Sequence, residues 1–181
     1  MGGDFSSAIG AQSMVETKFE DGLPTTHVES TTHGDNFMWN AEGRIIHGES
    51  ADFHFYEEGL HNITLEVSNG ECKSRIDKQV KIDQYNLMAV NAFNPKSPEP
   101  MNNTFIPFAL TVRNTSFRMI IINSRDGGVV YETTDASMPW DGTDNRTGKV
   151  ENTITTYIWK VVLDSPELGE PAEYKGTIIK L

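Results

Sequence analysis

The chain lacks cysteine pairs, any basic cluster and any long hydrophobic run. Its 181 residues include one cysteine, Cys72, which excludes an internal disulfide framework and a cysteine-rich zinc site. No stretch approaches the roughly 18 apolar residues needed to cross a bilayer, so we expect no membrane insertion. With 15 Lys and Arg against 26 Asp and Glu, the net charge of −11 argues against nucleic acid or an anionic membrane as partner.

The start of the chain also lacks the features of a signal peptide. Met-Gly-Gly-Asp provides neither a charged n-region nor an apolar h-region. The chain is therefore either cytoplasmic or the terminal part of a longer exported protein. A hydrophobic content of 37% with 23% charged residues is enough for a buried core, which argues against wholesale disorder.

Apolar residues recur at every second position along much of the chain, as in half-buried β-strands. A continuous apolar run over residues 119–122 predicts a strand buried on both sides. Asp-Gly, Glu-Gly and Asn-Gly turn signals separate these segments. Because one β-sandwich takes roughly 100 residues, we predict an all-β fold of two tandem immunoglobulin-like β-sandwich domains. The clearest alternating stripes are Ile63, Leu65 and Val67; Ile76, Val80 and Ile82; and Tyr157, Trp159, Val161 and Leu163.

A domain boundary is expected near residues 84–87. A predicted strand ends at Ile82, and a loop with prolines at 95, 98 and 100 follows, through which a central strand cannot run. We therefore predict one domain over residues 1–86 and a second, closely neighbouring one over 87–181. Residues 7–20 can be drawn as an amphipathic helix, but no cap or stop signal supports it, so we favour an irregular lead-in followed by a strand.

The first half resembles a PKD domain, an immunoglobulin-like sandwich common on bacterial surfaces. Residues 37–43 read Phe-Met-Trp-Asn-Ala-Glu-Gly where the family has aromatic-x-Trp-Asp-Phe-Gly-Asp-Gly, and residues 51–70 follow its next strands and turn. The resemblance implies that Trp39 fills the centre of the sandwich, facing Ile63, Leu65 and Val67. Some PKD repeats pair a cysteine at the position of Cys72 with one near their start; that partner is missing, so we expect a free thiol.

The second half carries six landmarks in a fixed order. They are Val-Asn-Ala-Phe-Asn-Pro at 90–95, Phe-Ile-Pro at 105–107, an Ile-rich hairpin at 119–132, Pro-Trp-Asp-Gly-Thr at 139–143, Tyr-Ile-Trp at 157–159, and a terminal strand at 174–181. In this order they resemble the gliding-motility-associated C-terminal domain of the Bacteroidetes, a type B sorting domain of the type IX secretion system. Residues 96–103 lack the carboxylates of the family's Asn-Gly-Asp-Gly-x-Asn-Asp loop, so we assign no calcium there.

The resemblance implies a non-catalytic terminal region of a secreted or surface protein that is exported through the periplasm. The second domain would be a sorting signal, read by the type IX secretion machinery and by an outer-membrane retention partner, and the first a spacer or adhesive module. A free strand edge can accept a strand from such a partner. The candidate recognition residues are Asn123, Arg125, Asp126 and Gly127 in the hairpin and Gly176, Thr177, Ile178, Ile179, Lys180 and Leu181 in the last strand. The candidate core residues are Trp39, Ile63, Leu65, Val67, Trp140, Tyr157 and Trp159.

Metal and cofactor sites have no support in the sequence. Asp135, Asp141 and Asp144 could form a cation loop, but they lack EF-hand spacing, and an Asp-Gly turn after a buried Trp140 explains them better. The histidines lack helical zinc spacing, and we expect them at the surface or at strand edges, with His54 and His61 in the two strands of one hairpin.

Enzyme activity has no positive support either. There is no Gly-x-Ser-x-Gly elbow and no glycine-rich phosphate loop, and Cys72 adjoins Glu71. The main alternative is an adhesion module that binds a surface polysaccharide or protein through the first domain. Its sequence basis would be an exposed aromatic patch formed by Phe53, Phe55 and Tyr56.

Overall fold

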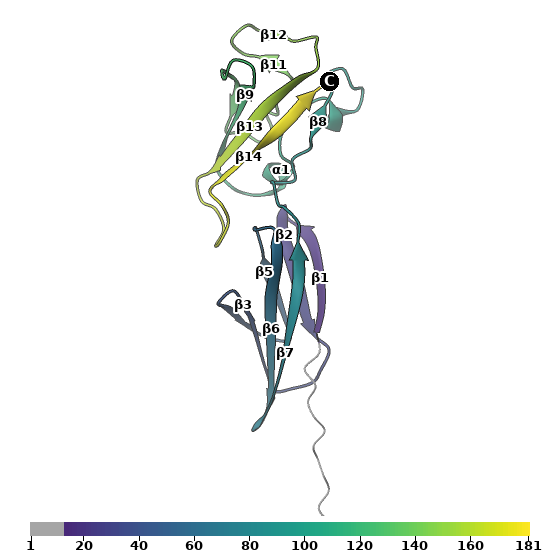
Figure 1. Ribbon diagram of the computed structural model, residues 1–181, viewed down its shortest axis with the longest axis vertical. Helices are drawn as coiled ribbons and strands as arrows, with labels where there is room; N and C mark the ends of the chain where they lie inside the picture. The colour runs from purple at the N-terminus through teal and green to yellow at the C-terminus, as the bar shows by residue number, and fades with distance from the viewer. Residues whose placement is uncertain (1–12) are drawn as a thin grey trace, which may run out of the picture. The chain divides into compact units, whose positions relative to one another are not determined.

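The computed structural model describes residues 13–181, which divide into two compact units (Figure 1). The first unit holds residues up to Glu20 together with Pro24–Gln84, and the second holds Asp21–Leu23 together with Tyr85–Leu181. Strands dominate both units, so the predicted all-β sandwich fold is confirmed. The part of the expected lead-in that covers residues 1–12 lies outside the described residues, whereas residues 13–20 form a strand rather than a helix.

Two sheets pack face to face in the first unit. One has the order β1–β2–β5 and the other β4–β3–β6–β7. A single apolar core joins them, contributed by Val28 and Phe53 on one side and by Trp39 and Leu65 on the other. The strands are β1 (Ser13–Glu20), β2 (Leu23–Ser30), β3 (Asn36–Ala41), β4 (Arg44–His47), β5 (Ser50–His54), β6 (Gly59–Asn69) and β7 (Cys72–Ile82).

Trp39 lies at the centre of this core, but its expected neighbours stand beside it rather than opposite. Trp39 in β3 is the cross-strand partner of Leu65 in β6, so both belong to the same sheet. The residues that face it across the sandwich come from β2 and β5, because those strands form the other layer. The indole Nε1 donates a hydrogen bond to the carbonyl oxygen of Gly48 at 3.0 Å, which satisfies the one polar atom of the ring.

The hairpin predicted for His54 and His61 is wrong. His54 ends β5, which pairs with β2, and His61 lies in β6, which pairs with β3 and β7. The chain therefore crosses from one sheet to the other between these two histidines. Sequence alternation shows that both segments are strands, but it does not show which strands share hydrogen bonds.

The second unit is built on one five-stranded sheet of order β10–β9–β13–β14–β8, in which β14 and β13 lie side by side along most of their length (Figure 1). Neighbouring strands in this sheet are antiparallel, except that β8 runs parallel to β14. A separate two-stranded ribbon pairs β11 with β12. The elements are β8 (Ala92–Phe93), η1 (Pro100–Asn102), α1 (Ala109–Val112), β9 (Phe117–Asn123), β10 (Val129–Thr133), β11 (Thr143–Asp144), β12 (Lys149–Val150), β13 (Thr155–Leu163) and β14 (Glu173–Lys180).

An aromatic layer covers the inner face of this sheet. Trp140 lies edge-on to Tyr157, with ring centroids 4.7 Å apart, and Phe93 lies 5.2 Å from Trp140. Phe105 and Trp140 exchange two backbone hydrogen bonds, of 2.8 and 2.9 Å, which joins two loop segments into one cover. The core of the second unit therefore lies between the sheet and irregular chain, and both layers are rich in aromatic rings.

The prediction that residues 119–122 are buried on both sides is wrong. Met119 and Ile121 are fully buried, whereas Ile120 and Ile122 are only half-buried. The latter two point to the outer face of the sheet, away from the aromatic layer. A continuous apolar run can therefore belong to a strand with one covered face.

Gly176 makes room for the indole of Trp159. The two residues are direct cross-strand partners in β14 and β13. An added Cβ at Gly176 would lie 2.7 Å from two carbons of the Trp159 ring, which is well inside van der Waals contact. The indole can lie over the β14 backbone only because position 176 has no side chain.

A buried ion pair joins α1 to the connection between β13 and β14. Both Nη atoms of Arg113, which follows α1, donate to the Glu170 carboxylate at 2.5 and 2.7 Å. The Arg113 side chain is 6% exposed and that of Glu170 is 0% exposed. The hydroxyl of Tyr174 and the N–H of Glu167 also donate to this carboxylate, at 3.1 and 2.9 Å. Every charge in the cluster is thus hydrogen-bonded, as burial requires.

We predict that Gly176→Ala destabilises the protein. At an unstrained strand position this change stabilises by about 0.4–1 kcal/mol, but here the methyl group meets the indole, and overpacking costs about 1–3 kcal/mol. Urea denaturation followed by Trp fluorescence measures the free energy of unfolding. Thr177→Ala, at the neighbouring exposed position, is the control. An unchanged or increased stability of Gly176→Ala would contradict the packing described for Trp159.

Glu170→Gln should lower the free energy of unfolding by about 3–5 kcal/mol, because it leaves the buried Arg113 charge unpaired. Glu173→Gln is the matched control, since Glu173 pairs with Lys160 at 2.7 Å while its side chain is 49% exposed. An exposed pair of this kind contributes about 0–1 kcal/mol. Thermal and urea unfolding compare the two variants, and equal losses would show that the buried pair has no special weight.

The Glu170 contribution should disappear in acid. Burial by itself raises the pKa of Glu170, but the hydrogen bonds from Arg113 and from the Glu167 N–H bring the pKa below its usual value. An unfolded Glu has a pKa of ~4.3, so the stabilisation is complete above that pH and is lost as the pH falls through the lower pKa of the folded state. The stability difference between wild type and Glu170→Gln should therefore narrow below pH ~4. A constant difference from pH 7 to pH 2 would refute this.

Candidate functional site

The turn between β9 and β10 is held rigid by Asn123. The Asn123 side-chain oxygen accepts a hydrogen bond from the N–H of Arg125 at 2.9 Å, and its carbonyl accepts one from Gly127 at 2.8 Å. Gly127 has φ of +70°, in the left-handed region that favours glycine. Asp126 Oδ1 accepts the N–H of Gly128 at 2.8 Å. The predicted hairpin residues therefore form a self-bonded turn that presents the charged groups of Arg125 and Asp126 to solvent.

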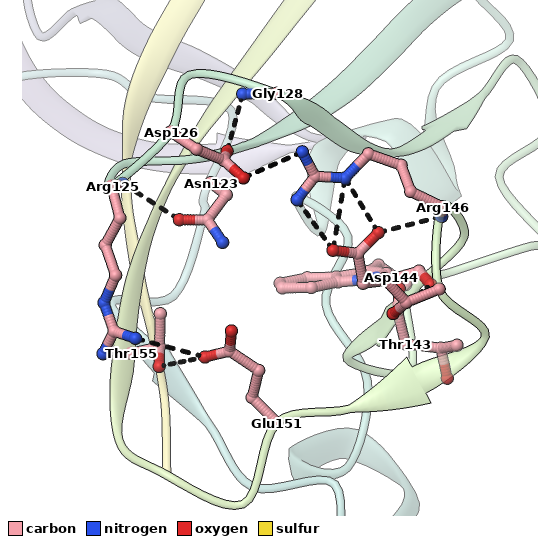
Figure 2. A network of polar contacts seen from close by, with 11 residues as sticks. Asn123, Arg125, Asp126, Gly128, Thr143, Asp144, Arg146, Glu151 and Thr155 are labelled. Atoms are coloured by element: carbon pink, nitrogen blue, oxygen red, sulfur yellow. Dashed lines mark hydrogen bonds and ion pairs between the residues drawn. The ribbon is translucent and has the colours of Figure 1, made fainter.

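Arg146 ties the β11–β12 ribbon to this turn. Its Nη1 donates to Asp126 Oδ2 at 3.0 Å, and its Nη2 donates to Asp144 Oδ2 at 2.8 Å, so the guanidinium lies between two carboxylates (Figure 2). The side-chain hydrogen bond from Arg146 lowers the pKa of Asp144. The pKa of Asp126 is lowered first by the Gly128 N–H and then by Arg146. Both carboxylates are therefore charged at neutral pH, and the cluster is a fixed arrangement of alternating charges.

Glu151 connects the turn to the last strand. Its carboxylate lies 3.7 Å from Arg125 Nη1 and accepts a hydrogen bond from Thr155 Oγ1 at 2.9 Å (Figure 2). Its carbonyl oxygen accepts a hydrogen bond from Nζ of Lys180, which also reaches the Thr153 carbonyl at 3.5 Å. The two recognition elements that were predicted separately from the sequence thus meet at one end of the second unit.

Lys180 is a buried lysine in this arrangement. It is 1% exposed, and burial lowers its pKa. Its position on the inner face of β14 directs the ammonium towards the loop that follows β12. It therefore positions the 151–153 segment and offers little surface to a partner.

The edge that was expected to be free at the last strand is closed at the end of the strand, and residues 173–178 have β13 as their one strand partner. Residues 155–162 of β13 pair with residues 173–180 of β14 on one side, and β8 pairs in parallel with Ile179 and Lys180 on the other. The N–H groups of Ile179 and Leu181 donate to the carbonyls of Asn91 and Phe93, each at 2.9 Å. Residues 179–181 cannot accept a further strand, because β8 occupies that edge.

The side chains of the last strand divide between two faces. Ile178 and Lys180 are buried on the inner face, and Gly176 faces the Trp159 indole. Ile179 is 37% exposed and Leu181 is 54% exposed; Thr177 is exposed as well. A partner can therefore touch Thr177, Ile179 and Leu181 among the six predicted residues of this strand, whereas the others maintain the fold.

Several residues of the site were not singled out by the sequence analysis. Arg146, Glu151 and Thr155 carried no recognisable motif, and Asp144 was considered only as a cation ligand. The one available signal was the opposite charge of Asp144 and Arg146 two positions apart, which does not indicate that Arg146 also reaches Asp126. Contacts of this kind depend on tertiary structure, because Asp126 and Arg146 are 20 positions apart.

The three aspartates considered as a cation loop serve local turns and an ion pair. Asp141 Oδ1 accepts the N–H of Thr143 at 2.8 Å, and Asp135 Oδ1 accepts that of Ser137 at 2.8 Å. Asp144 pairs with Arg146. Across residues 13–181, no three His, Cys, Asp or Glu side chains gather in a way that could hold a metal ion.

In the first unit, the structure removes the aromatic patch considered for the adhesion alternative and corrects the expected place of one histidine. Phe53 and Phe55 are 1% exposed and Tyr56 is 7% exposed, so they form no surface aromatic patch; all three pack inward where β5 leaves its sheet. His61 was expected at the surface but is 8% exposed, because it shares the inner face of β6 with Ile63. Its Nδ1 lies 2.5 Å from Glu42 Oε1 and its Nε2 lies 2.8 Å from the Glu57 carbonyl.

The predicted core residues are buried, and the cysteine is exposed. Cys72 is a free, exposed thiol at the start of β7. Within the described part of the chain, no helix is both long and apolar enough to cross a membrane. All of the predicted core residues are at most 2% exposed: Trp39, Ile63, Leu65, Val67, Trp140, Tyr157 and Trp159.

Comparison with known proteins yields a likeness among solved structures. No protein-family model matches the chain. No curated protein matches it either. Among solved structures, the chain is similar to the PKD1 domain from the Vibrio cholerae metalloprotease PrtV, with 19% sequence identity and a TM-score of 0.34 over 42% of this chain and 100% of that chain.

Proposed function

We propose that the chain is a non-catalytic region of a secreted or surface protein, in which the second unit is a folded sorting and surface-attachment signal for type IX secretion. The first unit serves as a spacer or adhesive module. The observation that carries the proposal is the convergence of the hairpin turn and the last strand, through Glu151, at one end of the second unit. A signal read by a partner protein needs such a contiguous, preformed surface.

The geometry of this end suits recognition of a folded surface. The side chains of Arg125 and Asp126 are 61% and 52% exposed, yet the backbone beneath them is fixed by Asn123 and Gly127. A rigid turn loses little conformational entropy when it binds, which favours affinity. Its alternating charges favour a partner of complementary charge pattern and so contribute to specificity.

β13 and β8 pair with the two sides of Ile179 and Lys180, so this end of the last strand offers no open backbone edge to a partner. The apolar side chains of Ile179 and Leu181 remain available on the outer face, beside the charged turn in the same unit. We therefore expect the partner to bind side chains, with a charged contact at the turn and an apolar one at the last strand.

The test is a localisation experiment in a gliding Bacteroidetes host. The whole chain is fused behind a signal peptide and a fluorescent reporter, and expressed with and without a working type IX system. We expect the reporter at the cell surface or in the medium in the first strain, and in the periplasm in the second. Periplasmic reporter in both strains would refute the sorting function.

Charge reversal locates the recognition surface. We predict that Arg125→Glu reduces surface delivery at least fivefold, because it places a negative charge beside Asp126 and Glu151. Arg118→Glu is the matched control. Arg118 lies near the start of β9, the strand that leads into the turn, and its side chain is 60% exposed and also pairs with one glutamate. Circular dichroism of both purified variants serves as the control for folding. Equal surface delivery of the two variants would show that the turn is not part of the recognition surface.

Deletion of Gly176–Leu181 is a less informative test. It removes the buried Ile178 and Lys180 together with the pairing of β14 to β8. Loss of delivery would then follow from unfolding as readily as from loss of recognition. Substitutions at the exposed positions Thr177 and Ile179 avoid this ambiguity.

A further inference from the structure

The outer face of the four-stranded sheet in the first unit carries a hollow of about 450 Å³. The hollow crosses all four strands, because a row of direct cross-strand partners lies along it: His47 in β4, Met38 in β3, Glu66 in β6 and Arg75 in β7. Cross-strand partners share a face of the sheet. This face is the outer one, since the neighbouring Trp39 of β3 points into the core.

The hollow holds one apolar side chain, that of Met38, among charged and polar ones. Met38 is half-buried in its middle. Arg75 lies on one side, where its Nη2 donates to Asp77 at 3.0 Å and its Nη1 lies 3.7 Å from Glu66. The side chain of Arg75 is nevertheless 60% exposed, so the guanidinium keeps donors for a ligand. Lys73 adds an ammonium at the same end.

The charge of this region is opposite to that of the whole chain. β7 carries four of the 15 Lys and Arg residues within 11 positions, against one acidic residue, in a protein with a net charge of −11. Lysines on an edge strand also oppose strand-to-strand association, which accounts for cations along β7 in general. That role does not account for a hollow that gathers Lys73, Arg75 and His47 around Met38.

We propose that this hollow binds a polysaccharide that carries carboxylates, such as a polyuronate. Arg75 and Lys73 pair with a uronate carboxylate, and Glu66 and His47 hydrogen-bond sugar hydroxyls. The apolar face of a sugar ring lies on Met38. Charged hydrogen bonds of this type are about twice as strong as neutral ones and give the site its selectivity for acidic over neutral sugars.

Two observations favour this ligand over its rivals. The aromatic residues Trp39, Phe53 and Phe55 are buried, so the first unit offers a neutral sugar no stacking platform among them, and recognition depends on charge. An acidic peptide would bind by main-chain pairing along the β7 edge, whereas the hollow runs across the strands. The inference goes beyond the sorting function, because it assigns a ligand to the first unit.

The experiment titrates the whole chain with three carboxylate-bearing oligosaccharides, derived from polygalacturonate, alginate and hyaluronate, by isothermal calorimetry at low salt. We expect at least one to bind, with an affinity that falls as salt is added. A methyl-esterified or carboxyl-reduced form of the same oligomer should bind at least tenfold more weakly. Failure of all three oligomers to bind would overturn the proposal.

Paired variants of β7 distinguish the hollow from diffuse charge. Arg75→Gln should weaken binding at least tenfold, and Lys81→Gln less than twofold. Both changes remove one exposed cation from the same strand, but Lys81 does not line the hollow. Equal losses of oligosaccharide affinity in the two variants would overturn the proposal. So would binding of polyglutamate that Arg75→Gln weakens as much as it weakens oligosaccharide binding. Both variants leave Arg125 unchanged. The localisation experiment therefore tests the sorting function independently of the binding experiment.

Discussion

The pairing of β14 on both of its sides is the constraint on which the second unit depends. Its residues 173–180 pair with β13, and its end pairs with β8, so the last strand lies inside the sheet. This position places Gly176 beneath the Trp159 indole and Ile178 in the core. At Ile179 and Lys180 both sides of the strand are paired, so recognition of this end has to proceed through side chains, whereas residues 173–178 are paired with β13 alone.

The same constraint organises the candidate site. Lys180 reaches from the inner face of β14 to the Glu151 carbonyl, and the Glu151 carboxylate lies near Arg125 in the hairpin turn. Arg146 then joins that turn to the β11–β12 ribbon. The surface of this end is therefore fixed by contacts among segments that are distant in the sequence. The first unit differs: its proposed site is a row of residues on one sheet face, set by the register of four adjacent strands.

Much of the fold was predictable because alternation is a local signal. The stripe at Ile63, Leu65 and Val67 and the stripe at Tyr157 and Trp159 both lie in strands, with those side chains buried. The failures share one cause. His61 follows the inward phase of β6 although its side chain is polar, and Phe53 in β5 and Phe55 just after it both pack into the core. In each case burial was decided by the other layer.

The sequence by itself determined that the chain is all-β, where its strands alternate and which rings can form a core, because period-two patterning and turn chemistry act over a few residues. Only the tertiary structure decided strand order, and with it three results. β5 and β6 belong to different sheets, the end of the last strand is covered by β8, and Arg146 and Glu151 reach the predicted turn. The physical reason is that strand pairing and ion pairs join groups by distance in space, and alternation in sequence carries no information about which strands become neighbours.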